Sequence, residues 1–140
     1  MADDESIVAK VSEHLGYIGY TVKKEQPPAG TNADVRIATH PQKLNILVRD
    51  FNNGVMVQTL LRGNDTAKAE VLEYLSFVND LNRASAVVRW YADKDSDLLG
   101  EAWYPGPYDR TGFGVFFDSW HRDTESQLTR AADAAKRFLR

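Results

Sequence analysis

The chain has 140 residues, of which 43% are apolar and 26% charged, and its formal net charge is −3. These values are typical of one globular domain, exclude a disordered chain, and give no overall attraction to nucleic acid or acidic lipid. The absence of cysteine excludes disulfides, a thiolate nucleophile and zinc–sulfur sites. The start "MADDESIVAK" is acidic where a signal peptide is basic, and no apolar run approaches the roughly 18 residues of a membrane span. We therefore expect a cytoplasmic protein without a membrane partner.

The first half of the chain predicts one helix followed by four strands. Apolar spacing indicates a helix over residues 3–15, with acidic residues at its start and Gly16 as its C-cap. The segments "YIGYTVKKE" and "ADVRIAT" read as strands on either side of the loop "QPPAGTN". The stretch "LNILVRDFNNGVMVQTLL" alternates on both sides of Asn53-Gly54. This pattern predicts a hairpin with a type I′ turn, because both central residues need positive φ.

The second half predicts a helix, a second hairpin and a long final helix. The helix is expected to start at Asp65 or Thr66 and to end near Leu81, with an inner stripe of Ala67, Val71, Leu75 and Val78. "AVVRWYA" and "LLGEAWY" flank the acidic loop "DKDSD" as a hairpin. Apolar steps of three or four between Phe113 and Leu139 indicate one helix. The order αββββαββα predicts a single α+β domain over residues 1–140, an antiparallel sheet with helices packed on one face.

Two asparagines stand where the second helix gives way to a strand. Asn82 directly follows Leu81, the last apolar helical position, and asparagine accepts the left-handed conformation that closes helices. We expect a structural cap at Asn82, with Asn79 tying the helix end to a neighbouring loop through its amide. A cap is favoured here over a ligand-binding role.

Motifs for catalysis, metals and nucleotides are incomplete. Asp93, Asp95 and Asp97 have the alternate spacing of a calcium loop. Leu98 and Tyr104, however, stand where that loop needs glycine and glutamate. No histidine lies one helical turn from another; they are His14, His40 and His121. We therefore expect no enzyme activity, no catalytic or metal site and no cofactor.

The last segment, "RAADAAKRFLR", is basic. Its cations are Arg130, Lys136, Arg137 and Arg140. Lysine and arginine near a helix C-terminus are ordinary partners of the helix dipole, so a solvated helix end is the favoured interpretation. Direct nucleic-acid binding is disfavoured by the acidic chain, and a nucleic-acid-associated regulator using this basic helix is kept as the alternative function.

Side-chain alternation divides the predicted strands into two faces, and Arg49, Arg89 and Glu101 mark the outward one. The inward set is Ile46, Val48, Val55, Val57, Val88 and Trp90. The outward apolar set is Leu47, Phe51, Met56, Leu60, Tyr91, Leu99 and Trp103. Aromatic residues and methionine with arginine among them are typical of interfaces, and monomers rarely expose apolar patches beyond roughly 300–600 Å².

We therefore expect the outward set to be a protein interface, with Trp103 as its anchor. A homodimer is the simplest solution, because one self-complementary patch closes on itself. A partner protein is the other candidate occupant. Two alternatives stay open: the loop "YPGPYDRTG" can fold over this face, or a one-residue slip in register can reverse every assignment.

The stretch "VLEYLSFVNDLNRAS" followed by "AVVRWYADKDSDLLGEAWY" resembles the bacterial YbjN-type family, whose fold is similar to that of type III secretion chaperones. In that family a helix ending in "N-x-L-N", matched by Asn79, Leu81 and Asn82, leads into an aromatic-containing strand, an acidic turn and a second strand. The segment "YPGPYDRTGFGVFFDSWH" departs from the family in its proline, glycine and aromatic content. The resemblance implies a small, often dimeric, non-enzymatic protein of regulation or stress response, with a chaperone-like fold that binds partner polypeptide.

Overall fold

The computed structural model describes residues 6–27 and 29–140. Its strands form one antiparallel sheet in the order β1-β2-β3-β4-β6-β5. The elements, in chain order, are α1 (Ile7–Tyr17), β1 (Thr21–Lys24), β2 (Val35–Thr39), β3 (Ile46–Phe51), β4 (Gly54–Leu61), α2 (Asp65–Ala69), α3 (Val71–Ala84), β5 (Arg89–Ala92), β6 (Leu98–Pro105), α4 (Arg110–His121), η2 (Arg122–Ser126), α5 (Gln127–Arg130) and α6 (Ala132–Phe138). The α+β class and the order αββββαββα are confirmed, with two of the predicted helices divided into shorter pieces.

The chain divides into two compact units. Unit 1 comprises the residues up to Gln58 together with Trp103–Phe117, and unit 2 comprises Thr59–Ala102 and Asp118–Arg140. The expected single domain stays a prediction. Among the residues that the structure describes, no helix has both the length and the hydropathy of a membrane span.

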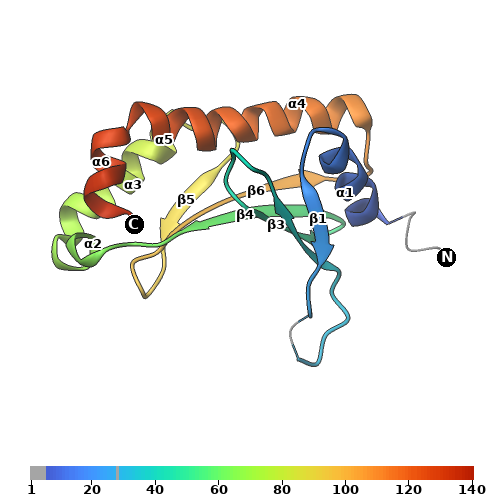
Figure 1. The fold of residues 1–140 in the computed structure, drawn as a ribbon, viewed down its shortest axis with the longest axis horizontal. Helices are drawn as coiled ribbons and strands as arrows, with labels where there is room; N and C mark the ends of the chain where they lie inside the picture. The colour runs from blue at the N-terminus through green and yellow to red at the C-terminus, as the bar shows by residue number, and fades with distance from the viewer. Residues whose placement is uncertain (1–5, 28) are drawn as a thin grey trace. The chain divides into compact units, whose positions relative to one another are not determined.

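In unit 1, α1 lies against the strands through a fully buried stripe of Val8, Val11 and Leu15 (Figure 1). The helix begins after Ser6, whose Oγ accepts the Ala9 N–H at 3.0 Å. Residues 3–5 of the predicted helix lie outside the described residues. The predicted cap at Gly16 is wrong, because α1 continues to Tyr17 and is closed by Gly19, whose φ of 104° suits glycine.

The hairpin between β3 and β4 is confirmed, but its turn lies one residue earlier than predicted. Asn52 and Asn53 are the residues with positive φ, at 49° and 63°, and Phe51 pairs with Gly54. Gly54 therefore belongs to β4. A side chain at Gly54 would collide with the carbonyl oxygen of Tyr104, so the glycine permits close approach of β6.

The predicted inward face of the sheet is confirmed. All six residues are at most 5% exposed: Ile46, Val48, Val55, Val57, Val88 and Trp90. The register agrees with this assignment, because Val48 pairs with Val57 and Leu47 pairs with Gln58 on the opposite face. The one-residue slip is thereby excluded for the β3–β4 pair.

In unit 2 the predicted helix over 65–81 is divided at Glu70, whose φ of −110° and ψ of 63° are not helical. Asn64, rather than Asp65 or Thr66, is the N-cap of α2. The break rotates the following helix, so Val71 and Leu75 of the expected inner stripe are exposed. The buried face of α3 is instead Tyr74, Phe77, Val78 and Leu81.

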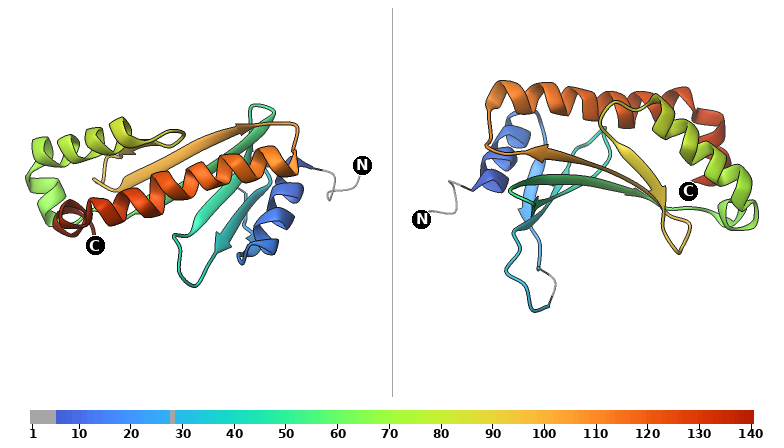
Figure 2. Two further views of the ribbon diagram at one scale, coloured as in Figure 1. Left: turned by 90° about the horizontal axis from the view of Figure 1, so that it is seen from above. Right: turned by 180° about the vertical axis from the view of Figure 1, so that it is seen from behind.

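The C-terminal α6 packs beside α3 in unit 2 (Figure 2). Phe138 stacks on Phe77 at 5.8 Å between ring centroids and lies 5.4 Å from the Tyr74 ring. The final helix is not continuous as predicted. It contains the π-helical turn η2 and breaks at Ala131, whose φ of −95° and ψ of 30° separate α5 from α6.

The π-helical turn places a carboxylate inside unit 2. Asp123 is fully buried, and its Oδ2 accepts the backbone N–H groups of Ala86, Val87 and Val88 at 2.8, 2.6 and 3.0 Å. Those residues connect α3 to β5. One carboxylate oxygen thus satisfies three successive donors that belong to neither a helix nor a strand.

We predict that Asp123→Ala lowers the free energy of unfolding by about 3 kcal/mol or more, because it leaves three backbone donors without their acceptor. Urea unfolding followed by circular dichroism measures the change. Asp118→Ala, at an exposed position five residues earlier, is the matched control and should change stability by less than about 0.5 kcal/mol. Equal losses in the two variants would contradict this role for Asp123.

Candidate functional site

The helix-free face of the strands in unit 1 carries an exposed aromatic pair. Phe51 and Trp103 are each 42% exposed, and the Trp103 Nε1–H donates to the Phe51 carbonyl oxygen at 2.9 Å. The Arg49 guanidinium lies over the Phe51 ring, 5.0 Å from its centroid, and its Nε donates to Gln58 at 3.1 Å. We call Arg49, Phe51 and Trp103 the aromatic surface of unit 1.

The backbone at Gly54 makes room for this arrangement. A Cβ at that position would lie 2.6 Å from Trp103 Nε1, so only glycine lets the indole ring lie against β4. The ring is therefore held by a hydrogen bond on one edge and by the strand beneath it. A side chain fixed before binding loses little conformational entropy when a partner arrives.

The remaining predicted residues of unit 1 contribute less surface. Leu47 is half-buried, and Met56 is only 3% exposed. Met56 pairs with Arg49, so it lies on the outward side of β4 as predicted, but it adds almost no accessible surface there. Phe51 and Trp103, by contrast, lie near the ends of their strands.

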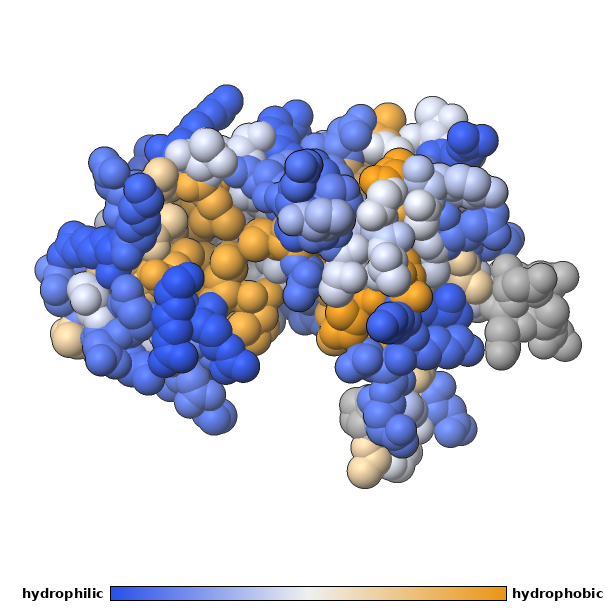
Figure 3. Space-filling view, viewed as in Figure 1, coloured by the Kyte–Doolittle hydropathy of each residue, from blue (hydrophilic) through white to orange (hydrophobic). Residues whose placement is uncertain are grey.

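In unit 2 the outward face is partly polar. Leu60 and Tyr91 are exposed and Leu99 is half-buried. Between them lies the buried Glu101, which forms an ion pair with Arg89 and accepts the Tyr91 hydroxyl at 3.1 Å. Figure 3 shows another apolar area in this unit, below the helices at the left of the view. The interface role of all these residues stays a prediction.

Asn82 does not close the helix, and its backbone is not in the left-handed conformation. Asn82 lies within the last turn of α3, which continues to Ala84 with Ser85 as its C-cap, and its φ is not positive. Its amide instead pairs with the backbone of β5. Oδ1 accepts the Trp90 N–H at 2.8 Å and Nδ2 donates to the Trp90 carbonyl at 2.9 Å. Asn79 is exposed on the same helix.

The acidic loop is tied to the rest of unit 2 by its own side chains. Asp93 Oδ1 accepts the N–H groups of Asp95 and Asp97, and Asp97 Oδ1 accepts that of Gly63, each at 2.9 to 3.0 Å. The Tyr74 hydroxyl donates to the Ser96 carbonyl at 2.8 Å, and burial raises the pKa of Tyr74 to about 12. These bonds use one oxygen of Asp93 and one of Asp97, and the structure brings carboxylate oxygens of Asp93, Asp95 and Asp97 within 4.8 Å of one another. The expectation of no metal stays a prediction.

The basic C-terminal segment is partly used within unit 2. Arg137 forms an ion pair with Glu70 and lies over the Phe138 ring at 4.8 Å. The side chain of Arg137 therefore helps to hold α6 beside the α2–α3 junction. Arg130, Lys136 and Arg140 are exposed, and Arg137 is exposed as well despite its ion pair.

Two long-range contacts stand out among the polar contacts that the sequence does not predict. One is the Asp123 carboxylate, and the other is a 2.7 Å contact between His14 Nδ1 and the Tyr108 hydroxyl. Both join residues more than thirty positions apart. An aspartate within the apolar pattern of the last helix was the one available signal for the first contact.

The elements and their order define a YbjN-type α+β fold, as the resemblance implied. The chain is similar to the crystal structure of YbjN from E. coli, which is described as a candidate transcription regulator. The TM-score is 0.68 at 12% sequence identity, over 94% of this chain and 93% of YbjN. At this identity the similarity concerns the fold alone. No protein-family model and no curated protein matches the chain.

We predict that Asn82→Gly and Asn82→Ala both lower the free energy of unfolding by about 2 kcal/mol, because each removes two hydrogen bonds to β5. A left-handed cap would instead tolerate glycine. Thermal unfolding of both variants distinguishes the two roles. Asn79→Ala, at an exposed position one turn earlier, is the control, and a tolerated Asn82→Gly would restore the cap interpretation.

Proposed function

We propose that this chain is a non-enzymatic adaptor or chaperone-like protein that binds a partner polypeptide on the aromatic surface of unit 1. The observation that carries the proposal is the exposed pair of Phe51 and Trp103, held in place by the Trp103–Phe51 hydrogen bond and by Arg49. Tryptophan, aromatic and arginine side chains dominate the energetics of protein interfaces. Covering this surface removes two large rings from water at roughly 25 cal/mol per Å².

Docking of side chains is favoured over addition of a strand. At one edge of the sheet, β5 has its Trp90 backbone groups occupied by the Asn82 amide. At the other edge, β1 carries Lys23 and Lys24, and lysine on an edge strand disfavours pairing with another chain. The partner therefore binds the face of the sheet rather than extending it.

A second copy of the chain is the simplest occupant of this surface, because an isologous patch satisfies itself in a two-fold dimer. The fold similarity to YbjN, a candidate transcription regulator, supports a role in regulation. A cytoplasmic location and a part in the stress response belong to the same proposal.

We predict that Trp103→Asp converts the dimer to monomer, or abolishes capture of the partner, while the circular dichroism spectrum stays that of the folded protein. Light scattering after gel filtration measures the first effect. Phe51→Asp should act in the same way. Val115→Asp is the control, because Val115 is 64% exposed in unit 1 but lies on α4. A parent that is monomeric, with a Trp103→Asp variant that captures the same partners, would overturn the proposal.

The competing function is a nucleic-acid-associated regulator that uses the exposed Arg130, Lys136 and Arg140. Binding through these cations requires release of counterions, so affinity for duplex DNA would fall steeply with salt. We expect no such binding at physiological salt. Fluorescence anisotropy with labelled duplex, repeated with Lys136→Gln combined with Arg140→Gln, measures it. Tight binding that is weakened by salt and by the double variant would favour the competing function.

A further inference from the structure

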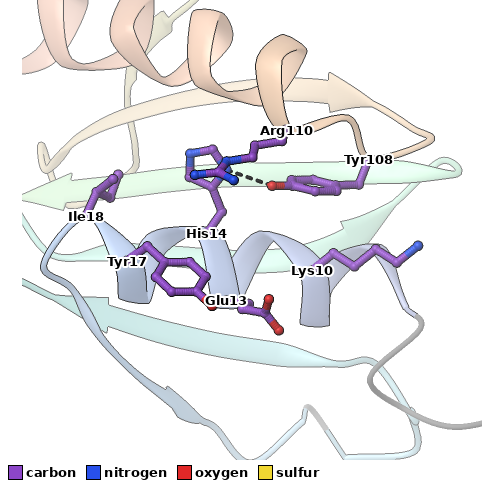
Figure 4. A pocket seen from close by; sticks show the side chains of 7 residues that line it. All are labelled: Lys10, Glu13, His14, Tyr17, Ile18, Tyr108 and Arg110. Carbon is purple, nitrogen blue, oxygen red and sulfur yellow. Dashed lines mark hydrogen bonds between the residues drawn. The ribbon is translucent and has the colours of Figure 1, made fainter.

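A cavity of about 490 Å³ lies in unit 1 beside α1 (Figure 4). One wall is a stripe of α1 with helical spacing, opposite the stripe that packs on the strands. The other wall is the segment that leads into α4. The lining residues are Lys10, Glu13, His14, Tyr17, Ile18, Tyr108 and Arg110. None of them belongs to the aromatic surface of unit 1.

Two cations, Lys10 and Arg110, line the cavity. Among the described residues, neither Lys10 nor Arg110 takes part in an ion pair, and Glu13 is the only carboxylate of the lining. Asp109 is adjacent in sequence, but its Oδ2 accepts the Gly112 N–H at 2.6 Å at the start of α4. The lining therefore has an excess of positive charge.

Polar groups of the cavity are fixed in position. His14 Nδ1 and the Tyr108 hydroxyl lie 2.7 Å apart, and the His14 ring packs edge-on against Phe113 at 5.0 Å. In Figure 4 the Arg110 guanidinium lies alongside the His14 ring. Burial, together with the charge of Arg110, lowers the pKa of His14, and burial raises the pKa of Tyr108. At neutral pH the imidazole is therefore neutral and the phenol protonated.

The outer part of the cavity is apolar. Tyr17 is 80% exposed and Ile18 is 42% exposed, although both lie at the end of a well-packed helix. Large apolar side chains next to unpaired cations match a ligand with one charged end and one apolar end. The arrangement also differs from that of a protein interface, because the cations line a concave site.

We propose that this cavity binds a small organic anion, with its carboxylate or phosphate group beside Arg110 and its apolar part against Tyr17 and Ile18. Lys10, which points away from Arg110 in Figure 4, adds positive charge at the other end of the lining. Arginine offers a planar set of donors that suits either group, and lysine adds a point charge. The Tyr108 hydroxyl is a further hydrogen-bonding group near the charged end. The ligand would thus be held by charge on one side and by apolar contact on the other.

Binding of such an anion is coupled to the protonation of His14. In the free protein the nearby Arg110 disfavours the imidazolium, and an anion beside Arg110 offsets that repulsion. The pKa of His14 should therefore rise on binding, and affinity should increase as pH falls through that pKa. The other titratable groups that line the cavity with His14 are Lys10 and Glu13 on α1, Tyr108 before α4 and Arg110 at its start, and Asp109 lies beside Tyr108.

Benzoate and its uncharged counterpart benzamide are suitable probes of this site. Titration of the full chain with millimolar benzoate, followed by NMR of the histidine and tyrosine side chains, should shift the signals of His14 and Tyr108. Benzamide should leave them unchanged. Arg110→Gln should weaken benzoate binding about ten-fold or more, and Lys10→Gln should also weaken it. Lys23→Gln, an exposed lysine of unit 1 outside the cavity, should bind benzoate as the parent does.

The proposal is overturned if benzoate does not shift His14 and Tyr108, if benzamide shifts them equally, or if Arg110→Gln and Lys10→Gln both bind benzoate as the parent does. Inorganic phosphate, tested in the same way, shows whether the charged end alone is sufficient: shifts of the same signals that Arg110→Gln removes support the proposal. Trp103→Asp should keep the benzoate site intact, so failure here and failure of the proposed adaptor function are separate results.

Discussion

The bond between the Asp123 carboxylate and three backbone donors fixes the connection on which unit 2 depends. The segment of Ala86, Val87 and Val88 leaves α3 and must enter β5 at a defined position. Without an acceptor inside the protein, three buried or half-buried N–H groups would have to remain open to water. The π-helical turn η2 brings the carboxylate to that place, which explains why the last helix is irregular there.

The same connection determines how the sheet can be used. With the start of β5 held by Asp123, the Asn82 amide can meet both backbone groups of Trp90. The amide substitutes for a neighbouring strand at that residue. Within the "N-x-L-N" stretch, Asn82 therefore covers the backbone of the edge strand at Trp90 and does not end the helix.

Strand alternation and turn chemistry were sufficient to predict the sheet, because they depend on neighbours in sequence. Alternation predicted the six inward residues, and turn chemistry predicted the hairpin between β3 and β4. The turn itself lies one residue earlier than predicted, and Gly54 belongs to β4, where it lies against Tyr104. Features that depend on distant contacts were missed. The break at Glu70 turned Val71 and Leu75 toward solvent, and strand alternation did not show that Met56, on the outward side of β4, is only 3% exposed.

The candidate sites could be predicted to the same extent: features set by neighbours in sequence were predicted, and features set by distant contacts were not. Composition and parity identified Phe51 and Trp103 as outward, since a strand alternates whatever surrounds it. The cavity beside α1 could not be predicted in this way, because Tyr108 and Arg110 reach His14 from a segment more than ninety positions away. From the sequence, the loop that contains Tyr108 is only a candidate cover for the outward face of the sheet.

The exposure of the tryptophans gives the protein a built-in optical signal. Of its three tryptophans, Trp90 and Trp120 are 3% and 2% exposed, whereas Trp103 is 42% exposed. Collisional quenchers such as iodide therefore reach the emission of a single indole, the one on the aromatic surface. Any molecule that covers that surface shields the same indole, so occupancy can be followed by fluorescence without a label.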